Sequence, residues 1–198
     1  MGDAYLKKII VVFNLKNDAR KKALLARRNM SVKERRIASE KISKKIILSR
    51  EFLNAELIAC YLPMIDEVDT RLVIEHGWRA KKRIFLPKMH DNRELSFCEI
   101  KPDTPLIRKR NIVWEPENEN YISPKELQLV ITPTVAFDEN YNRIGMGKGY
   151  YDHCFSFRRE NNHEPQPKLI GAAFHCQKVE KISVNSWDIR LFGVFCEK

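Results

Sequence analysis

The amino-acid sequence predicts a three-layer α/β domain with a mostly parallel sheet, and three observations lead to this prediction. Short apolar runs that end at prolines alternate with stretches whose apolar residues recur at helical spacing. The length of 198 residues suits a single domain. Hydrophobic residues make up 43% and charged residues 31% of the chain, which provides both a core and a solvated surface and excludes a disordered or collagen-like protein.

The first quarter of the chain is expected to be helical. From Asp18 onward, apolar residues such as Ala19 and Ala23 fall on one side of a helix. Ser31 and Glu34 have the spacing of a capping box, in which each side chain accepts a hydrogen bond from the other residue's backbone N–H, so a second helix should begin there. The expected core positions of this second helix are Ile37 or Ala38, Ile42, Ile46 and Ile47.

Residues 1–15 are expected to be an N-terminal extension of unknown role, and residues 16–198 a single domain. Ile9–Phe13 could be an edge strand, an oligomer contact or an ill-ordered leader, and the sequence does not decide among these. This run is too short for the apolar core of a signal peptide, and no run approaches the roughly 18 apolar residues of a membrane span. We therefore expect a cytoplasmic protein.

The middle of the chain predicts a strand, a helix and a second strand. Leu57–Leu62 and Arg83–Leu86 are apolar runs that each end at a proline. Asp69 and Thr70 lie between them, where they can cap a helix. Two short apolar strands joined by a helix form a βαβ unit, so these strands should be parallel. Leu95–Ile100 alternates between apolar and polar residues as an edge strand would.

The second half of the chain predicts three more strands. Residues 101–125 contain four prolines and mixed charge, which indicates a long loop of the kind that often carries function. Leu127–Thr132 is a strand, followed by a short apolar run, a polar turn, a glycine-rich stretch and a helix from about Tyr150. The remaining strands are expected at Leu169–Phe174 and Leu191–Cys196.

The positive charge of the chain is concentrated at its start. Residues 1–50 hold 15 of the 36 lysines and arginines but only 4 of the 26 aspartates and glutamates. Such a segment can be a nucleic-acid-binding arm, a solvated helix surface, or a set of cations that face a bound anionic small molecule. The solvated surface is the commonest of these outcomes.

Three of the seven glycines alternate in the stretch before the helix at Tyr150: Gly145, Gly147 and Gly149. Glycine permits positive φ and a close approach of backbone N–H groups to a ligand, and N–H groups at the start of a helix can hold a phosphate. Lys148 within this loop adds positive charge. The stretch predicts a phosphate-binding loop, although it is neither a Walker A motif nor a dinucleotide-binding motif.

Asp152, in the first turn of the helix that follows, is not explained by anion binding. It is explained if Mg²⁺ lies between it and bound phosphates, because Mg²⁺ prefers one or two carboxylates together with phosphate oxygens. The alternative is a tight turn capped by Asp152, with Tyr150 and Tyr151 packed in the core.

Several motifs occur together, in order, over about residues 16–197. They are Lys16-x-x-x-Arg20, Met30-Ser31, Leu62-Pro63-Met64-x-Asp66-Glu67-x-Asp69-Thr70, Glu115-Pro116, Thr132-Pro133-x-Val135-Ala136-Phe137-Asp138, Arg143-x-Gly145-x-Gly147-x-Gly149-Tyr150-Tyr151-Asp152, Ala173-Phe174-x-x-Gln177 and Val184-x-x-Trp187-Asp188. This series resembles the 5-formyltetrahydrofolate cyclo-ligase (5,10-methenyltetrahydrofolate synthetase) family. The resemblance implies a fold like that of sugar-phosphate isomerases and CoA transferases.

The resemblance also implies a reaction, the ATP-dependent cyclisation of 5-formyltetrahydrofolate to 5,10-methenyltetrahydrofolate with release of ADP and phosphate. The formyl oxygen attacks the γ-phosphate of ATP to give a phosphorylated imidate, N10 attacks the activated carbon, and phosphate leaves. The expected protein is a C–N bond-forming ligase of one-carbon metabolism that takes ATP and a reduced folate, requires Mg²⁺, acts as a monomer, and binds neither a membrane nor a specific nucleic acid.

Site residues follow from the same resemblance. The residues that match ATP contacts are Lys16, Arg20, Arg143, Ile144, Gly145, Met146, Gly147, Lys148, Gly149, Tyr150 and Tyr151. The residues that match folate contacts are Met64, Asp69, Met146, Gly147, Lys148, Gly149 and Tyr150. The magnesium ligands would be Asp152 and Asp188. Phosphoryl transfer depends on positioning and charge neutralisation, so the expected catalytic residues are Lys148, Arg143 and Tyr150.

Two features depart from the commoner family pattern. Tyr141 replaces a glycine of the turn, so Asn140 or Asn142 is expected to take any left-handed conformation. Lys148 replaces the middle glycine of the loop, which also occurs within the family.

Two other classes of function remain open on the sequence. The basic first quarter is consistent with an RNA-binding or scaffold protein that has kept a ligase-like fold, but the presence of Asp152, Asp188 and Lys148 argues against it. The other class is an ATP-dependent enzyme of the same fold that acts on a different amide or carboxylate. Met64 and Asp69 are the positions that discriminate this alternative.

Overall fold

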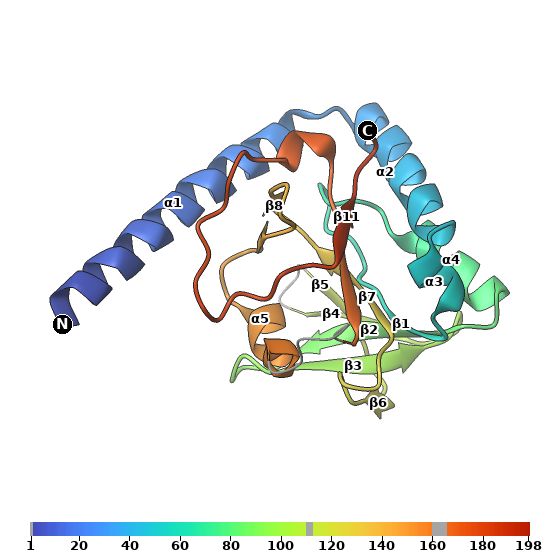
Figure 1. Cartoon of the computed structure of the whole chain (residues 1–198). Helices are drawn as coiled ribbons and strands as arrows, with labels where there is room; N and C mark the ends of the chain where they lie inside the picture. The colour runs from blue at the N-terminus through green and yellow to red at the C-terminus, as the bar shows by residue number, and fades with distance from the viewer. Residues whose placement is uncertain (1, 110–112, 160–165) are drawn as a thin grey trace.

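The computed structural model describes residues 2–109, 113–159 and 166–198, with side chains from residue 11 onward. Its central sheet has seven strands: β1 (Leu57–Ala59), β2 (Arg83–Met89), β3 (Leu95–Ile100), β6 (Tyr121–Ile122), β7 (Leu129–Pro133), β10 (Lys168–Ala172) and β11 (Gly193–Phe195). The strand order is β11-β10-β7-β1-β2-β3-β6 (Figure 1). The first five strands in this order are parallel, whereas β3 runs antiparallel to both of its neighbours, β2 and β6. The predicted α/β class with a mostly parallel sheet is therefore confirmed.

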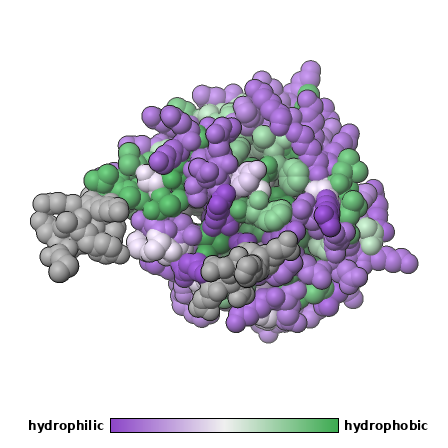
Figure 2. Space-filling view, in the orientation of Figure 1, coloured by the Kyte–Doolittle hydropathy of each residue, from purple (hydrophilic) through white to green (hydrophobic). Residues whose placement is uncertain are grey.

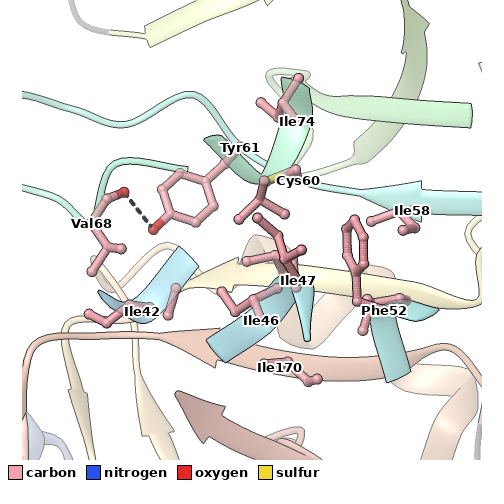
Figure 3. Packing of buried hydrophobic residues seen from close by; sticks show 14 of the residues in the cluster. Ile42, Ile46, Ile47, Phe52, Ile58, Cys60, Tyr61, Val68, Ile74 and Ile170 are labelled. Carbon is pink, nitrogen blue, oxygen red and sulfur yellow. Dashed lines mark hydrogen bonds between the residues drawn. The ribbon is translucent and has the colours of Figure 1, made fainter. Parts of the chain in front are cut away.

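Three helices cover one face of the sheet: α2 (Val32–Ile47), α3 (Arg50–Asn54) and α4 (Arg71–Arg79). Figure 3 shows Ile46 and Phe52 gathered with strand residues beneath these helices. Burying each such side chain stabilises the fold by roughly 1.5–3 kcal/mol. The fully buried members of this cluster include Ile42, Ile46, Phe52, Ile58, Ile84, Leu129, Ile131 and Phe174.

The opposite face is covered by α5 (Tyr150–Cys154), the 3₁₀ helix η1 (Ser156–Arg159) and the segment that precedes β11. Phe155 lies at the centre of this cluster, with its ring 5.8 Å from that of Phe97. Helical segments therefore lie on both faces of the sheet, as the expectation of three layers requires.

Helix α1 (Gly2–Asn29) is continuous, and its N-terminal part extends away from the domain (Figure 1). The edge-strand interpretation of Ile9–Phe13 is therefore wrong. The apolar run extends a helix whose later residues pack against the hairpin of β8 (Ala136–Phe137) and β9 (Arg143–Ile144). Where the side chains of α1 are described, Val11, Phe13 and Leu15 are exposed, and Figure 2 shows hydrophobic residues on this part of the helix.

The two predicted helix starts have different outcomes. The capping box at the start of α2 is confirmed: Glu34 N donates to Ser31 Oγ at 3.2 Å, and Ser31 N donates to Glu34 Oε2 at 2.7 Å. At the start of α4, Asp69 Oδ1 accepts from Arg71 N at 3.0 Å. Thr70 makes no capping bond, because its hydroxyl donates to the carbonyl of Tyr61 instead.

Part of the predicted loop at 101–125 is wrong, because this segment forms strands. A hairpin of β4 (Leu106–Lys109) and β5 (Val113–Pro116) is followed by β6, which pairs with β3. Leu95–Ile100 is therefore flanked by strands on both sides and is not the edge of the sheet.

Strand β2 also continues through Pro87, where the sequence predicted its end. The carbonyl of Phe85 faces β1, since it accepts from Cys60 N at 2.9 Å. Pro87 is two residues further on and faces the same side, where β1 has already ended at Ala59. No strand on that side needs the N–H that proline lacks.

The turn before β9 corrects another expectation. Tyr141 itself adopts the left-handed conformation, with φ of 60°, in place of Asn140 or Asn142. The buried carboxylate of Asp138 accepts the backbone N–H of both asparagines at 3.0 Å, and this fixes the turn around Tyr141.

Among the described residues, no helix has the length and hydropathy needed to cross a membrane.

Candidate active site

The strand order places a reversal at the centre of the sheet. From β1 the chain proceeds to β2 on one side, and from β7 it proceeds to β10 on the other, so neighbouring β1 and β7 lead in opposite directions. Ligands of open α/β sheets bind outside the carboxyl ends of the strands at such a point. The segment after β1 carries Met64 and Asp69, and the segment after β7 carries the glycine-rich loop.

The glycine-rich loop has the backbone that its residue types suggest. Gly147 and Gly149 have positive φ, of 101° and 72°, which other residues rarely adopt. Ile144 is buried in β9, and its carbonyl accepts from Val135 N at 2.9 Å, so its side chain is part of the core. Met146 and Lys148 are exposed.

Helix α1 reaches this loop from far away in the sequence. Arg20 Nε donates to the carbonyl oxygen of Gly145 at 2.8 Å. A Cβ on Gly147 would lie 3.5 Å from the guanidinium carbon of Arg20, so the same guanidinium lies beside both glycines. The structure thus brings one of the two predicted N-terminal ATP contacts to the predicted nucleotide loop.

Both predicted magnesium ligands are ion-paired. Asp152 Oδ1 accepts from Arg143 Nη2 at 2.9 Å and from Ile189 N at 3.0 Å. Asp188 is paired with Lys16, and its Oδ2 accepts from Asn185 N at 2.6 Å. Each pair joins a predicted phosphate-binding cation to a predicted metal ligand.

This donor set suits Mg²⁺. The two carboxylates are partly exposed, with 21% and 19% of the side-chain surface of Asp152 and Asp188 accessible. Within the described ranges, no three histidine, cysteine or acidic residues are grouped so as to hold a metal ion. Mg²⁺ bound with a nucleotide needs only one or two carboxylates, since phosphate oxygens and water complete its shell.

Arg143 lies in a low-polarity setting beside Tyr151. Its side chain is 5% exposed, and its guanidinium carbon lies 5.7 Å from the ring centre of Tyr151. Burial raises the pKa of Tyr151 well above its usual value, so the phenol stays neutral. Arg143 Nε and Tyr151 Oη are both buried without a hydrogen-bond partner among the described residues.

Met64 and Asp69 line a cavity of about 510 Å³. Asp69 is held by Arg71, whose Nε lies 2.9 Å from Oδ1. Burial opposes ionisation of Asp69, but the hydrogen bonds and charge of Arg71 outweigh it and hold the pKa of Asp69 below its usual value. The other residues that line this cavity are Leu62, Pro63, Ile65, Glu67, Arg71, Leu106 and Trp114.

Gly147, Lys148 and Tyr150 line a second cavity, of about 380 Å³, together with Asp91 and Arg93. Tyr150 Oη donates to the carbonyl of His90 at 3.3 Å, which ties the glycine-rich loop to the β2–β3 turn. The two cavities share no lining residue, so the predicted folate contacts fall into two groups.

Sequence reasoning missed the cavity residues contributed by hairpins. Leu106 and Trp114 lie in the segment interpreted as a loop, and Arg93 lies at the β2–β3 turn. The two short runs around 106–109 and 113–116 were the available signal, but prolines and charges interrupt them.

Comparison with known proteins shows the family to which the chain belongs. The profile of the 5-formyltetrahydrofolate cyclo-ligase family matches residues 12–197. The chain belongs to this family. It is 33% identical to the 5-formyltetrahydrofolate cyclo-ligase of Escherichia coli strain K12 over 172 residues, covering 85% of this chain and 92% of that protein. The Haemophilus influenzae cyclo-ligase is 31% identical over 172 residues, covering 85% and 90%.

Solved structures show the same fold. The Aquifex aeolicus 5,10-methenyltetrahydrofolate synthetase superimposes with a TM-score of 0.78 at 30% identity, covering 93% of this chain and 90% of that one. The Mycoplasma pneumoniae synthetase gives 0.72 at 25% identity, covering 92% and 99%. The family and the cyclo-ligase class that the motifs implied are thus confirmed.

Proposed function

We propose that this cyclo-ligase converts 5-formyltetrahydrofolate and ATP into 5,10-methenyltetrahydrofolate, ADP and phosphate, with Mg²⁺ bound by Asp152 and Asp188. The observation that carries the proposal is the junction of Arg20 with the glycine-rich loop at the central reversal of the sheet. Cations from two segments far apart in the sequence and the backbone N–H groups of the glycine-rich loop meet there, which suits the phosphates of a nucleotide.

The chain's own residues would act by position and charge. Lys148 and Arg143 would neutralise the γ-phosphoryl group while the formyl oxygen attacks it, and Lys16 and Arg20 would hold the other phosphates. N10 would then attack the activated carbon of the phosphorylated imidate, and phosphate would leave together with the proton of N10. Tyr150, fixed through His90, would border the folate beside the loop.

When bound, Mg²⁺ supplies charge neutralisation for the phosphates of ATP. In the structure, Lys16 and Arg143 neutralise Asp188 and Asp152. When a nucleotide binds, Lys16 and Arg143 would pair with its phosphates in place of Asp188 and Asp152. Both carboxylates would then be free to bind the metal. The ion pairs would therefore hold the site together until ATP arrives.

The remaining expectations fit the same proposal. All five cysteines are free thiols, as in a reducing cytoplasm. We also propose that the enzyme acts as a monomer. We further propose residues 16–198 as the catalytic domain, because Lys16 already pairs with Asp188 near the other end of the chain. The layered sheet is also what a fold like that of sugar-phosphate isomerases and CoA transferases would show.

The direct test is to incubate the purified protein with 5-formyltetrahydrofolate, ATP and Mg²⁺ and to follow the absorbance of the methenyl product in the near ultraviolet. Product should form only when all three are present. A non-hydrolysable ATP analogue should yield none, because the γ-phosphoryl group must be transferred. Failure of the folded protein to form product at saturating substrates would refute the proposal.

A further inference from the structure

Arg27 is a buried arginine on helix α1. Its side chain points toward the segment that lines the 510 Å³ cavity. The residue is 2% exposed. Its Nη2 donates to Asp66 Oδ1 at 3.0 Å, and its Nη1 lies 4.0 Å from Glu67 Oε1. A buried guanidinium is tolerated only where such partners compensate for its lost hydration.

Glu67 connects Arg27 to the 510 Å³ cavity, because Glu67 is one of the residues that line it. Its Oε2 accepts the backbone N–H of Met64 at 3.0 Å, and 7% of its side chain is exposed. Burial raises the pKa of Glu67, while the bond from Met64 and the charge of Arg27 favour the ionised form. Arg27, Glu67 and Met64 therefore form one chain of polar contacts from α1 to the cavity.

Through Arg20 and Lys16, the same helix also contacts the glycine-rich loop and Asp188, which we assign to the nucleotide. We propose that Arg27 is a positioning residue for the folate: it fixes the segment from Met64 to Asp69 against α1 in the shape that binds the reduced folate. This inference rests on the proposed function, since it assigns the 510 Å³ cavity to the folate.

Neighbouring Arg28 provides a matched control. It lies on the same helix, with Nε 3.8 Å from Asp66 Oδ2, but 68% of its side chain is exposed. A pair in water contributes little, whereas loss of Arg27 leaves Glu67 buried without its cation. A role in folate positioning would show as a change in folate affinity alone, while a role in general stability would lower the affinity for both substrates.

The experiment measures the binding of 5-formyltetrahydrofolate alone and of ATP alone by calorimetry, in the full-length protein. Arg27→Met should raise the Kd for the folate about tenfold, because a charge-assisted contact is lost, and should change the Kd for ATP less than about twofold. Arg27→Lys should restore part of the affinity, and Arg28→Met should leave both constants unchanged. Steady-state kinetics should show the same split between the two KM values.

Glu67→Gln tests the same chain from its other end. Its amide oxygen can still accept the N–H of Met64, but it has no charge for Arg27, so a smaller, folate-only loss is expected even if Arg27→Met fails to fold. Equal loss of both affinities, or wild-type folate affinity in both Arg27→Lys and Glu67→Gln, would overturn the inference. A wild-type protein that does not bind 5-formyltetrahydrofolate would instead contradict the proposed function, and this inference with it.

Discussion

At the scale of single residues, the site depends on pairs that the sequence could not reveal. The glycines and Lys148 predicted a phosphate loop, and Asp152 predicted a metal ligand, from residue types and spacing alone. The pairing of Lys16 with Asp188 joins residues 172 positions apart, and it becomes visible only once the fold brings α1 to the C-terminal segment. The sequence places Arg27 on the same side of the helix as Ala19 and Ala23, but it does not reveal the partners of Arg27, which lie 39 or more residues away.

Asp152 allows a test of the metal proposal. Asp152→Asn should lower magnesium-dependent activity at least about tenfold, because a neutral amide loses the charge that holds a hard cation. The variant should keep its fold, since the remaining amide oxygen can still accept from Ile189 N. The measurement is initial rate against Mg²⁺ concentration, together with the Tm.

Asp103→Asn, at an exposed position, is the matched control and should titrate like the wild type. A magnesium titration of Asp152→Asn that coincides with the wild-type curve would reduce Asp152 to a structural partner of Arg143 and of the Ile189 backbone.

At the scale of elements, sequence patterns were reliable where local chemistry and packing agree. The capping box fixed the start of α2, and the apolar runs located β1, β2 and β7. The patterns failed where tertiary context decides. The β-branched run Ile9–Phe13 suits a strand, yet it continues a helix. Pro87 looked like a strand end, but the end of its neighbour β1 makes the proline tolerable.

Helix α1 is the element whose function is easiest to isolate. If Lys16 and Arg20 contact the phosphates of ATP, changing both to Ala should raise the KM for ATP about tenfold or more, since each charged contact contributes roughly 1.5–3 kcal/mol. The KM for folate should barely change. Initial rates with each substrate varied in turn would separate the two effects.

The double variant Lys33→Ala with Lys41→Ala removes the same charge from exposed positions of α2 and should behave like the wild type. Unchanged ATP kinetics in the Lys16 and Arg20 double variant would mean that α1 only braces the glycine-rich loop.

At the scale of the whole molecule, the sheet reversal and the charge distribution act together. The reversal gathers the segments after β1 and β7, and α1 adds cations beside them. Fold class and family could be read from the sequence because they rest on apolar patterning and a long motif series. The division of the site into two cavities could not, since it depends on hairpins whose own patterns are weak.

The concentrated positive charge makes a last prediction about nucleic acid. Several cations of the first quarter already serve the fold: Lys16, Arg20 and Arg27 contact other segments, and Lys45 donates to the C-terminal carbonyls. Exposed residues such as Lys21 remain, and each phosphate that they neutralise adds about one unit to the salt dependence of binding. We therefore expect weak binding of single-stranded RNA that is insensitive to sequence and lost at physiological salt, measured by fluorescence anisotropy across a salt series. Tight, salt-resistant RNA binding that competes with ATP would show that the basic segment binds nucleic acid. The RNA-binding alternative would then replace the interpretation in which Lys16 and Arg20 contact ATP and the other cations are solvated.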